Sequence, residues 1–223
     1  RYYTLGWFHF LRQGFFANDR CPDDRWKRIS QEQNIQIQPW ITKRRDERKY
    51  ALICLQKVND STLLPMHETF GKYRNWISIV INQIRNQYPK IPIVIRPHLR
   101  TKENNWKKAI AGYQNVTVSD TWEDRSFYEG GDGLQKDLAG AKFVVSYNSN
   151  VLTECAIQGI PAVCWDIRSM AAPLCLDPYE MSNLNLVHDI QREPYLHRLA
   201  YTQWTRKEIR SGTAWEHLRK YNF

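Results

Sequence analysis

Five short apolar runs recur through the middle of the chain, separated by longer stretches of mixed polar and apolar residues. Nearly uninterrupted apolar runs of a few residues are typical of strands that are buried on both faces of a sheet. The five runs are Ala51–Leu55, Ile91–Ile95, Val116–Val118, Phe143–Tyr147 and Ala162–Trp165. Because helical segments alternate with them, the sequence predicts an α/β fold with a doubly wound parallel sheet. Right-handed crossovers favour the strand order 3-2-1-4-5, numbered along the chain.

The segments between these runs show helical spacing. From Phe70 to Tyr88 the apolar residues recur every three or four positions, which predicts one amphipathic helix that is ended by Pro89. Gly159 follows a further helical segment and suits a left-handed C-terminal cap, with Pro161 just beyond it. The other predicted helices cover Asn104–Ala111, Leu134–Ala141 and Val151–Gln158.

The positive charge is concentrated at the two ends of the chain. The formal net charge of +9 divides into +5 over residues 1–50, +1 over 51–185 and +3 over 186–223. Aromatic residues are interleaved with basic ones in both ends, a composition that suits a nucleic-acid strand, with charges on phosphates and rings on bases. The alternative is that these rings pack the ends onto the sheet or against another domain, and that basic stems cover them.

Composition excludes several classes of protein. No run approaches the ~20 apolar residues that a membrane helix needs, and no apolar stretch follows a basic start as in a signal peptide.

The five cysteines form no C-x-x-C pair, and Cys54 and Cys164 lie in apolar runs, where a thiol acts as a small hydrophobe. We therefore expect buried thiols in a reducing, cytoplasmic setting. Because the sequence opens at Arg1 and not at a methionine, we also expect a fragment or a processed product.

Polar loops follow three of the predicted strands. In a parallel sheet, ligands bind beyond the carboxyl ends of the strands, near the point where the strand order reverses. Each loop by itself also fits an ordinary turn, a solvated strand end or a helix N-cap. Three loops at one edge of the sheet that can each bind an anion favour a nucleotide site. The candidate residues are Gln56, Asp60 and Ser61 after the first strand, Arg96 and His98 after the second, and Ser146, Asn148, Ser149, Asn150 and Glu154 after the fourth.

The third of these loops leads directly into a predicted helix. Small hydroxyl and amide residues at this helix start are expected to leave backbone N–H groups aimed outward, where a phosphate can bind. Glu154, about one turn into the helix, is placed to accept hydrogen bonds from ribose hydroxyls. The phosphate-loop and dinucleotide glycine motifs are both missing, and no D-x-D pair is present to hold a divalent metal. We therefore expect a metal-independent site with no cofactor.

The chain resembles the nucleotide-sugar-binding half of GT-B glycosyltransferases, in particular the capsular polysaccharide synthesis group and related glycosyltransferase-like proteins of bacteriophages. The resemblance covers roughly residues 50–166 and is carried by Gln56-x-x-x-Asp60-Ser61, Arg96-Pro97-His98 and Ser149-Asn150-Val151-Leu152-Thr153-Glu154-Cys155-Ala156-x-x-Gly159-x-Pro161-Ala162-Val163. It implies that the ten candidate residues contact the sugar donor and that His98 is a candidate acid for the leaving group. It assigns no catalytic base, and Leu99 stands where the capsule group has a further proline.

The resemblance implies a glycosyltransferase that moves a sugar from a nucleotide-sugar donor to a hydroxyl group. The expected acceptor is a hydroxymethylated pyrimidine in bacteriophage DNA, because residues 202–215 also resemble the phage proteins and because basic ends suit a polyanionic acceptor. Two alternatives stay open, namely a cell-surface or capsular glycan as acceptor, and a non-catalytic nucleotide- or nucleic-acid-binding module. A viral enzyme of this kind would work in the host cytoplasm.

A complete GT-B enzyme has two Rossmann-like domains, of which the sequence displays one. We expect this Rossmann-like domain, of the GT-B C-terminal type, to span residues 50–185. Residues 1–49 are expected to form a basic, aromatic segment or the remnant of the acceptor-side domain. Residues 186–223 are expected to form a helical tail that packs back on the fold. The sequence does not indicate the sugar, the stereochemistry or the oligomeric state.

Overall fold

The computed structural model describes residues 7–9, 22–41, 48–98, 101, 105–122 and 132–222. The chain divides into two compact units. One unit, here called the sheet unit, comprises Ile37–Ile190 and contains the segment predicted to be Rossmann-like. The other, called the terminal unit, combines Arg1–Gln36 with Gln191–Phe223. The two ends that the sequence analysis treated as separate extensions therefore belong to one body.

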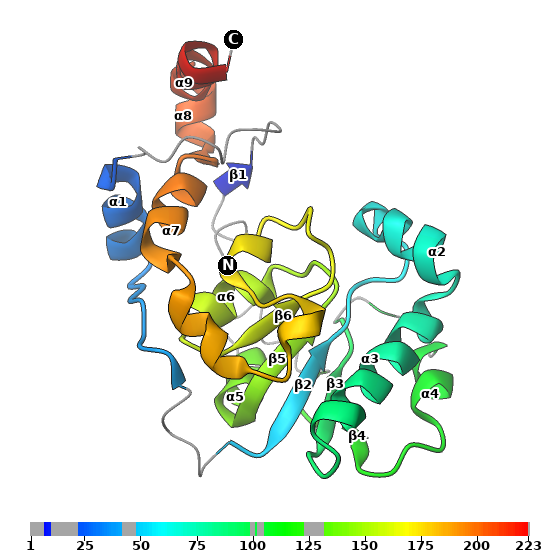
Figure 1. Cartoon of the computed structure of the whole chain (residues 1–223). Coiled ribbons are helices and arrows are strands. Elements are labelled where there is room, and N and C mark those ends of the chain that lie inside the picture. Colours follow the sequence, from blue (N-terminus) through cyan, green and yellow to red (C-terminus); the bar gives the residue numbers. More distant parts are fainter. Residues whose placement is uncertain are drawn as a thin grey trace. The chain divides into compact units, whose positions relative to one another are not determined.

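The sheet unit is built on five parallel strands in the order β4-β3-β2-β5-β6 (Figure 1). The strands are β2 (Tyr50–Cys54), β3 (Ile93–Arg96), β4 (Val116–Val118), β5 (Ala141–Ser146) and β6 (Ala162–Cys164). Counted along the chain, this order is 3-2-1-4-5, so the predicted topology is confirmed. The strand order reverses between β2 and β5, where Ile53 of β2 pairs with Val145 of β5.

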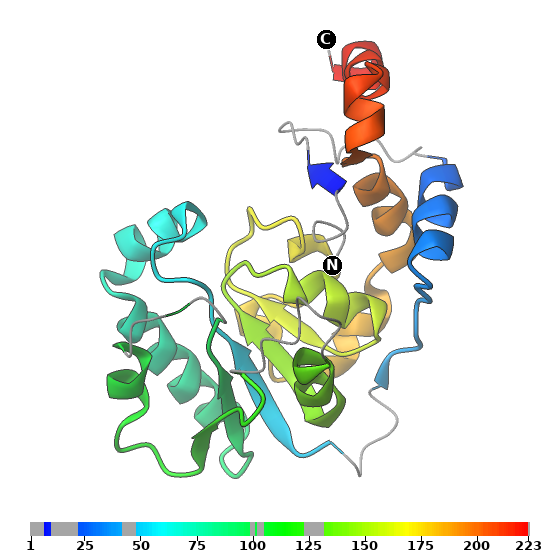
Figure 2. The same ribbon diagram turned by 180° about the vertical axis from the view of Figure 1, so that it is seen from behind.

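Helices cover both faces of this sheet. The side chains of β2 alternate between two apolar clusters, with Ala51 and Ile53 in one and Leu52 and Cys54 in the other. The first cluster includes Trp76 and is covered by α3 (Tyr73–Gln87) and α4 (Asn105–Ile110). The second is covered by α5 (Gly133–Gly140) and α6 (Val151–Ile157), and Figure 2 shows this arrangement from behind. Burial on both faces explains why β2, β3, β5 and β6 read as apolar runs, whereas β4, at the edge of the sheet, is only partly buried.

The single helix predicted from Phe70 to Tyr88 is wrong in one respect. The chain forms two helices here, α2 (Leu64–Phe70) and α3, which are separated at Gly71 and Lys72. Gly71 adopts a φ of 74°, which ends α2 and is a conformation that glycine accepts at little cost. The C-terminal end of α3 comes before Pro89 as expected, and Gly159 adopts the predicted left-handed conformation with a φ of 70°.

Cysteines in the sheet unit are free thiols. Cys54, Cys155 and Cys164 are buried and Cys175 is half-buried. Burial raises the pKa of the Cys54 thiol to about 12 and that of Cys164 to about 11. The predicted role of Cys54 and Cys164 as small hydrophobes in the core is therefore confirmed, whereas Cys21 lies outside the described residues.

The terminal unit joins the two ends of the chain through a strand pair and packed helices. β1 (Trp7–His9) pairs antiparallel with β7 (Gln203–Thr205). The helices are α1 (Asp24–Glu32), α7 (Arg192–Ala200), α8 (Arg206–Arg210) and α9 (Thr213–Asn222). Trp26, Tyr195 and Trp204 are buried in this unit. These three rings therefore serve packing, within the unit that the two ends form together, whereas the alternative interpretation had expected packing onto the sheet or against another domain.

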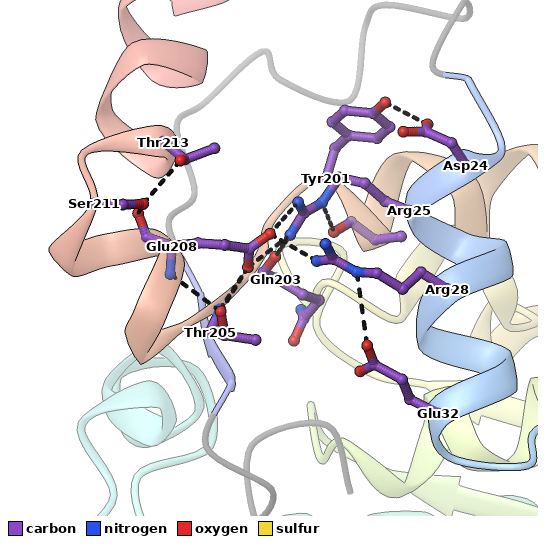
Figure 3. A network of polar contacts seen from close by, with 11 residues as sticks. Asp24, Arg25, Arg28, Glu32, Tyr201, Gln203, Thr205, Glu208, Ser211 and Thr213 are labelled. Atoms are coloured by element: carbon purple, nitrogen blue, oxygen red, sulfur yellow. Dashed lines mark hydrogen bonds and ion pairs between the residues drawn. The ribbon is translucent and has the colours of Figure 1, made fainter.

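A buried arginine connects the two segments of the terminal unit (Figure 3). The Arg25 guanidinium lies 4.1 Å from the centroid of the Trp204 ring and donates hydrogen bonds to the Ala200 and Gln203 carbonyls. Its Nη1 also pairs with Glu208 Oε1 at 2.8 Å, and Arg28 Nη2 reaches the same oxygen at 2.6 Å. Burial acts to raise the pKa of Glu208, but the hydrogen bonds from Arg25, Arg28 and Thr205 outweigh it and lower the pKa to about 2.

Candidate functional site

The loops that follow β2 and β5 meet at the carboxyl edge of the sheet, where the strand order reverses. The backbone N–H of Asn148 donates to Gln56 Oε1 at 3.1 Å, and Gln56 Nε2 donates in return to Asn148 Oδ1. The backbone N–H of Gln56 donates to the Tyr73 hydroxyl at 2.7 Å, which fixes the start of the loop against α3. The predicted convergence of these two loops is therefore present as a reciprocal pair of hydrogen bonds.

Asn148 also connects the two loops to the segments on either side of them. Its Nδ2 donates to the Thr62 carbonyl at 3.0 Å and to Asp166 Oδ2 at 3.2 Å. Asp60 caps the 3-10 turn η4 (Ser61–Leu63), since its Oδ1 accepts from the Thr62 backbone N–H at 3.0 Å and the Thr62 hydroxyl at 2.8 Å. Ser61 is exposed at the start of this turn. Thus loops after β2, β5 and β6 form one hydrogen-bonded group.

Asp166 and Arg168 belong to this group, and the sequence analysis missed both. Asp166 follows β6 and is buried, and its Oδ1 accepts from the Arg168 backbone N–H at 3.1 Å and from Arg168 Nε at 2.9 Å. The Arg168 side chain is 62% exposed. Its guanidinium is therefore an exposed cation that Asp166 orients at the edge of the sheet. The rule that ligands bind beyond strand ends applied equally to the loop after the fifth predicted strand, and it would have identified these residues.

Arg96 does not join this group. Its buried guanidinium pairs with Asp137 of α5 and donates to the Ser119 hydroxyl at 3.2 Å and the Thr121 hydroxyl at 2.8 Å. Ser119 and Thr121 follow β4 and Asp137 lies on α5, and together these partners satisfy the charge internally. The position of Arg96 at a strand end was predicted correctly, but its guanidinium is engaged away from the β2–β5 junction. His98, two residues after Arg96, is half-buried. Its carbonyl oxygen accepts a hydrogen bond from the Thr101 N–H at 2.8 Å.

The loop before α6 is held together by its own hydrogen bonds. The hydroxyl of Ser146 is buried and donates to the Cys54 carbonyl at 2.7 Å, so it joins β5 to β2. The Val151 N–H donates to Ser149 Oγ at 3.4 Å, and the Leu152 N–H donates to the Ser149 carbonyl at 3.1 Å. The expectation that N–H groups at this helix start point outward is therefore wrong for Val151 and Leu152, because the turn itself satisfies them.

Asn150 and Glu154 continue this pattern along α6. The Asn150 carbonyl accepts from the backbone N–H of Thr153 at 3.0 Å and of Glu154 at 3.4 Å. Glu154 is half-buried, and its Oε2 accepts from Gln135 Nε2 of α5 at 3.3 Å. The candidate residues thus fall into three places: the junction of loops at β2, β5 and β6, the β4 side of the sheet, and the α5–α6 surface.

Neither a protein-family model nor a curated protein matches the chain. Solved structures with a similar arrangement include three of the wall teichoic acid polymerase TagF, H444N variant, two of which are described as soaked with CDPG for 15 and 30 minutes. Their TM-scores are 0.42, 0.40 and 0.39, at 13%, 12% and 13% sequence identity. Each match covers 93% of this chain and 50%, 50% and 49% of the other chain, so this chain spans about half the length of those proteins. Likeness at this level identifies no function.

None of the helices in the described ranges is both long and apolar enough to cross a membrane. Within the same ranges, three or more His, Cys, Asp or Glu side chains do not gather in a way that could hold a metal ion.

Proposed function

We propose that this protein is a glycosyltransferase that binds a nucleotide-activated sugar at the junction of the loops after β2, β5 and β6. The observation that carries the proposal is the reciprocal pairing of Gln56 and Asn148 at the point where the strand order of a doubly wound sheet reverses. Sheets of this kind bind nucleotides beyond the carboxyl ends of their strands at this point. The resemblance of these loops to the donor half of GT-B enzymes adds the sugar transfer.

The charges at the junction suit a leaving group that carries phosphate. Arg168 is oriented by Asp166 and exposed, and Lys57 is exposed in the loop after β2. A guanidinium held in one orientation can stabilise the negative charge that develops on a departing phosphate. In this proposal Arg168 contacts the donor phosphate in place of Arg96, which was expected to contact the donor, and Arg96 is a buried residue that supports the end of β3. His98 is the candidate that protonates the leaving group.

For the acceptor we propose a hydroxymethylated pyrimidine in bacteriophage DNA. The support is the net charge of the chain, because a polyanionic acceptor is attracted by a +9 protein whereas a neutral glycan is not. The salt dependence of acceptor binding distinguishes these two acceptors. Binding of DNA should weaken steeply with added salt, whereas binding of a neutral glycan should change little.

Donor binding is tested first, by thermal unfolding with a panel of nucleotide sugars, each with and without a chelator. A ligand at a hundred times its dissociation constant adds about 2.7 kcal/mol of stability, so a binding donor raises the unfolding midpoint clearly. Asn148→Ala should abolish this rise. Asn86→Ala is the matched control, because Asn86 is exposed near the end of α3, away from the carboxyl edge.

Transfer is then measured by mass spectrometry of hydroxymethylated oligonucleotides incubated with the donor that binds. The expected product gains one sugar, and the Arg168→Ala variant forms it more slowly. The proposal is overturned if no nucleotide sugar shifts the midpoint, or if Asn148→Ala binds the donor as well as the unaltered protein does. Donor binding without donor cleavage would instead support the non-catalytic module.

A further inference from the structure

Exposed basic side chains gather on the last two helices of the terminal unit. Arg206, Lys207 and Arg210 are exposed on α8, and Arg219 is exposed on α9. Arg206 and Arg210 are one turn apart, so they lie on the same side of α8. Together with Trp215 of α9, these residues are called the α8–α9 surface.

The one carboxylate of α8 is turned away from this surface. Glu208 is 14% exposed and pairs with Arg25 and Arg28 of α1 while it closes the capping box with Thr205 (Figure 3). Its negative charge is therefore balanced within the unit, and the exposed charges of α8 are all positive. The described part of α9 carries a single carboxylate, Glu216, which is exposed one turn from Arg219. The surface keeps a net positive charge.

Trp215 is 59% exposed, whereas Trp26 and Trp204 of the same unit are buried. It lies four residues before Arg219, so the ring and the guanidinium share one side of α9. An exposed ring beside cations is the combination that binds single-stranded nucleic acid, because the cations meet phosphates and the ring stacks on a base.

We propose that the α8–α9 surface binds a single strand of nucleic acid. A membrane surface fits less well, because an interfacial helix inserts several large apolar side chains, and among the side chains of α8 and α9 whose exposure the structure describes, Trp215 is the one large apolar side chain that is exposed. The inference rests on the terminal unit and not on the proposed donor site. The surface would give a DNA acceptor a place to bind. Binding of a strand can nevertheless be tested without any sugar transfer.

The test is the fluorescence anisotropy of a labelled single-stranded oligonucleotide, measured with the full chain, without donor, over a range of salt concentrations. Each phosphate contact contributes about −0.7 to the slope of log affinity against log salt. Lys207→Gln/Arg210→Gln should therefore flatten the slope by about 1.4. The control is Lys90→Gln/Lys108→Gln, which removes the same charge from exposed positions of the sheet unit and should leave the slope unchanged.

The Trp215→Ala variant should weaken binding about 5- to 150-fold without a change in slope, and Trp215→Phe should keep most of the affinity. All of these positions are exposed, so the thermal midpoint of each variant should match that of the unaltered protein. Equal slopes for the α8–α9 variant and the control would overturn the proposal. The proposal would also be overturned if the protein bound phosphatidylserine vesicles more tightly than the oligonucleotide and if that binding depended on Trp215.

Discussion

Gln56 and Asn148, 92 residues apart in sequence, exchange two hydrogen bonds across the point where the strand order of the sheet reverses. Asn148 is fixed on its other side by Thr62 and Asp166. The amide orientations depend on one another, because turning Asn148 to suit a new partner would place its oxygen opposite the Thr62 carbonyl and the Asp166 carboxylate.

This interdependence predicts the effect of Gln56→Glu. The substitution removes the Nε2 donor and places a carboxylate oxygen against Asn148 Oδ1, so we expect the free energy of unfolding to fall by about 1–2 kcal/mol at neutral pH. Added negative charge should also weaken donor binding. Urea unfolding provides the measurement, and Gln87→Glu, at an exposed position near the end of α3, should cost less than about 0.5 kcal/mol. Equal costs for both variants would show that the pairing does not hold the junction together.

The buried pair of Arg96 and Asp137 predicts a non-additive double mutant. Asp137→Leu leaves the buried guanidinium without its counter-charge, and Arg96→Met leaves the buried carboxylate without its counter-charge. Each single change should therefore lower the free energy of unfolding by about 3–5 kcal/mol. The double variant should cost less than either, because no buried charge stays unpaired. Lys136→Met is the control, since it breaks an exposed pair with Asp132 and should cost no more than about 0.5 kcal/mol. Additive costs in a double-mutant cycle would contradict this account.

Sequence patterns predicted the sheet well and the orientation of its side chains less well. The five apolar runs predicted the strands, because β2, β3, β5 and β6 are largely buried. Their order followed from the rule that crossovers are right-handed. The direction of the Arg96 side chain left no such mark, since its partner Asp137 is 41 residues away. The pairing of β1 with β7 places Trp7 opposite Thr205, from the two ends of the chain, so no local pattern could predict it. The strand-end rule covers Asp166 as well, because Asp166 lies in the loop directly after β6.

Glu208 predicts how the terminal unit responds to acid. Its pKa in the folded protein is about 2, below its usual value near 4.5, so the unfolded chain binds its proton first as the pH falls. The stability that Glu208 contributes is therefore complete above about pH 4.5 and is lost as the pH falls towards 2. The protection factors of the β7 amides, that is, their exchange rates relative to the intrinsic rates at the same pH, should fall over this range.

In Glu208→Gln the acid-dependent part of this exchange should disappear, and the unit should lose about 2 kcal/mol at neutral pH. Glu193→Gln is the control, because Glu193 is an exposed carboxylate on α7 of the same unit. An unchanged acid response in Glu208→Gln would show that another carboxylate is responsible.

Gly159 and Gly112 form a matched pair that separates backbone strain from a steric clash. Both have positive φ, 70° at Gly159 and 89° at Gly112. A Cβ at Gly112 would meet nothing within 4 Å, whereas one at Gly159 would lie 2.0 Å from the Pro39 carbonyl oxygen. Hydrogen bonds from the Gln38 and Ile41 N–H groups to the Ile157 and Gly159 carbonyls hold that segment in place. The clash is with backbone, so no side-chain rotation relieves it.

We therefore expect Gly112→Ala to cost about 1 kcal/mol, from backbone strain alone, and Gly159→Ala to cost about 3 kcal/mol or more. Asparagine tolerates the left-handed conformation, so Gly112→Asn should recover most of its loss while Gly159→Asn should not. Urea unfolding followed by far-UV circular dichroism measures all four variants. Similar costs at the two positions would mean that the segment around Pro39 can move away from the end of α6, and that glycine is required at position 159 for its backbone conformation alone.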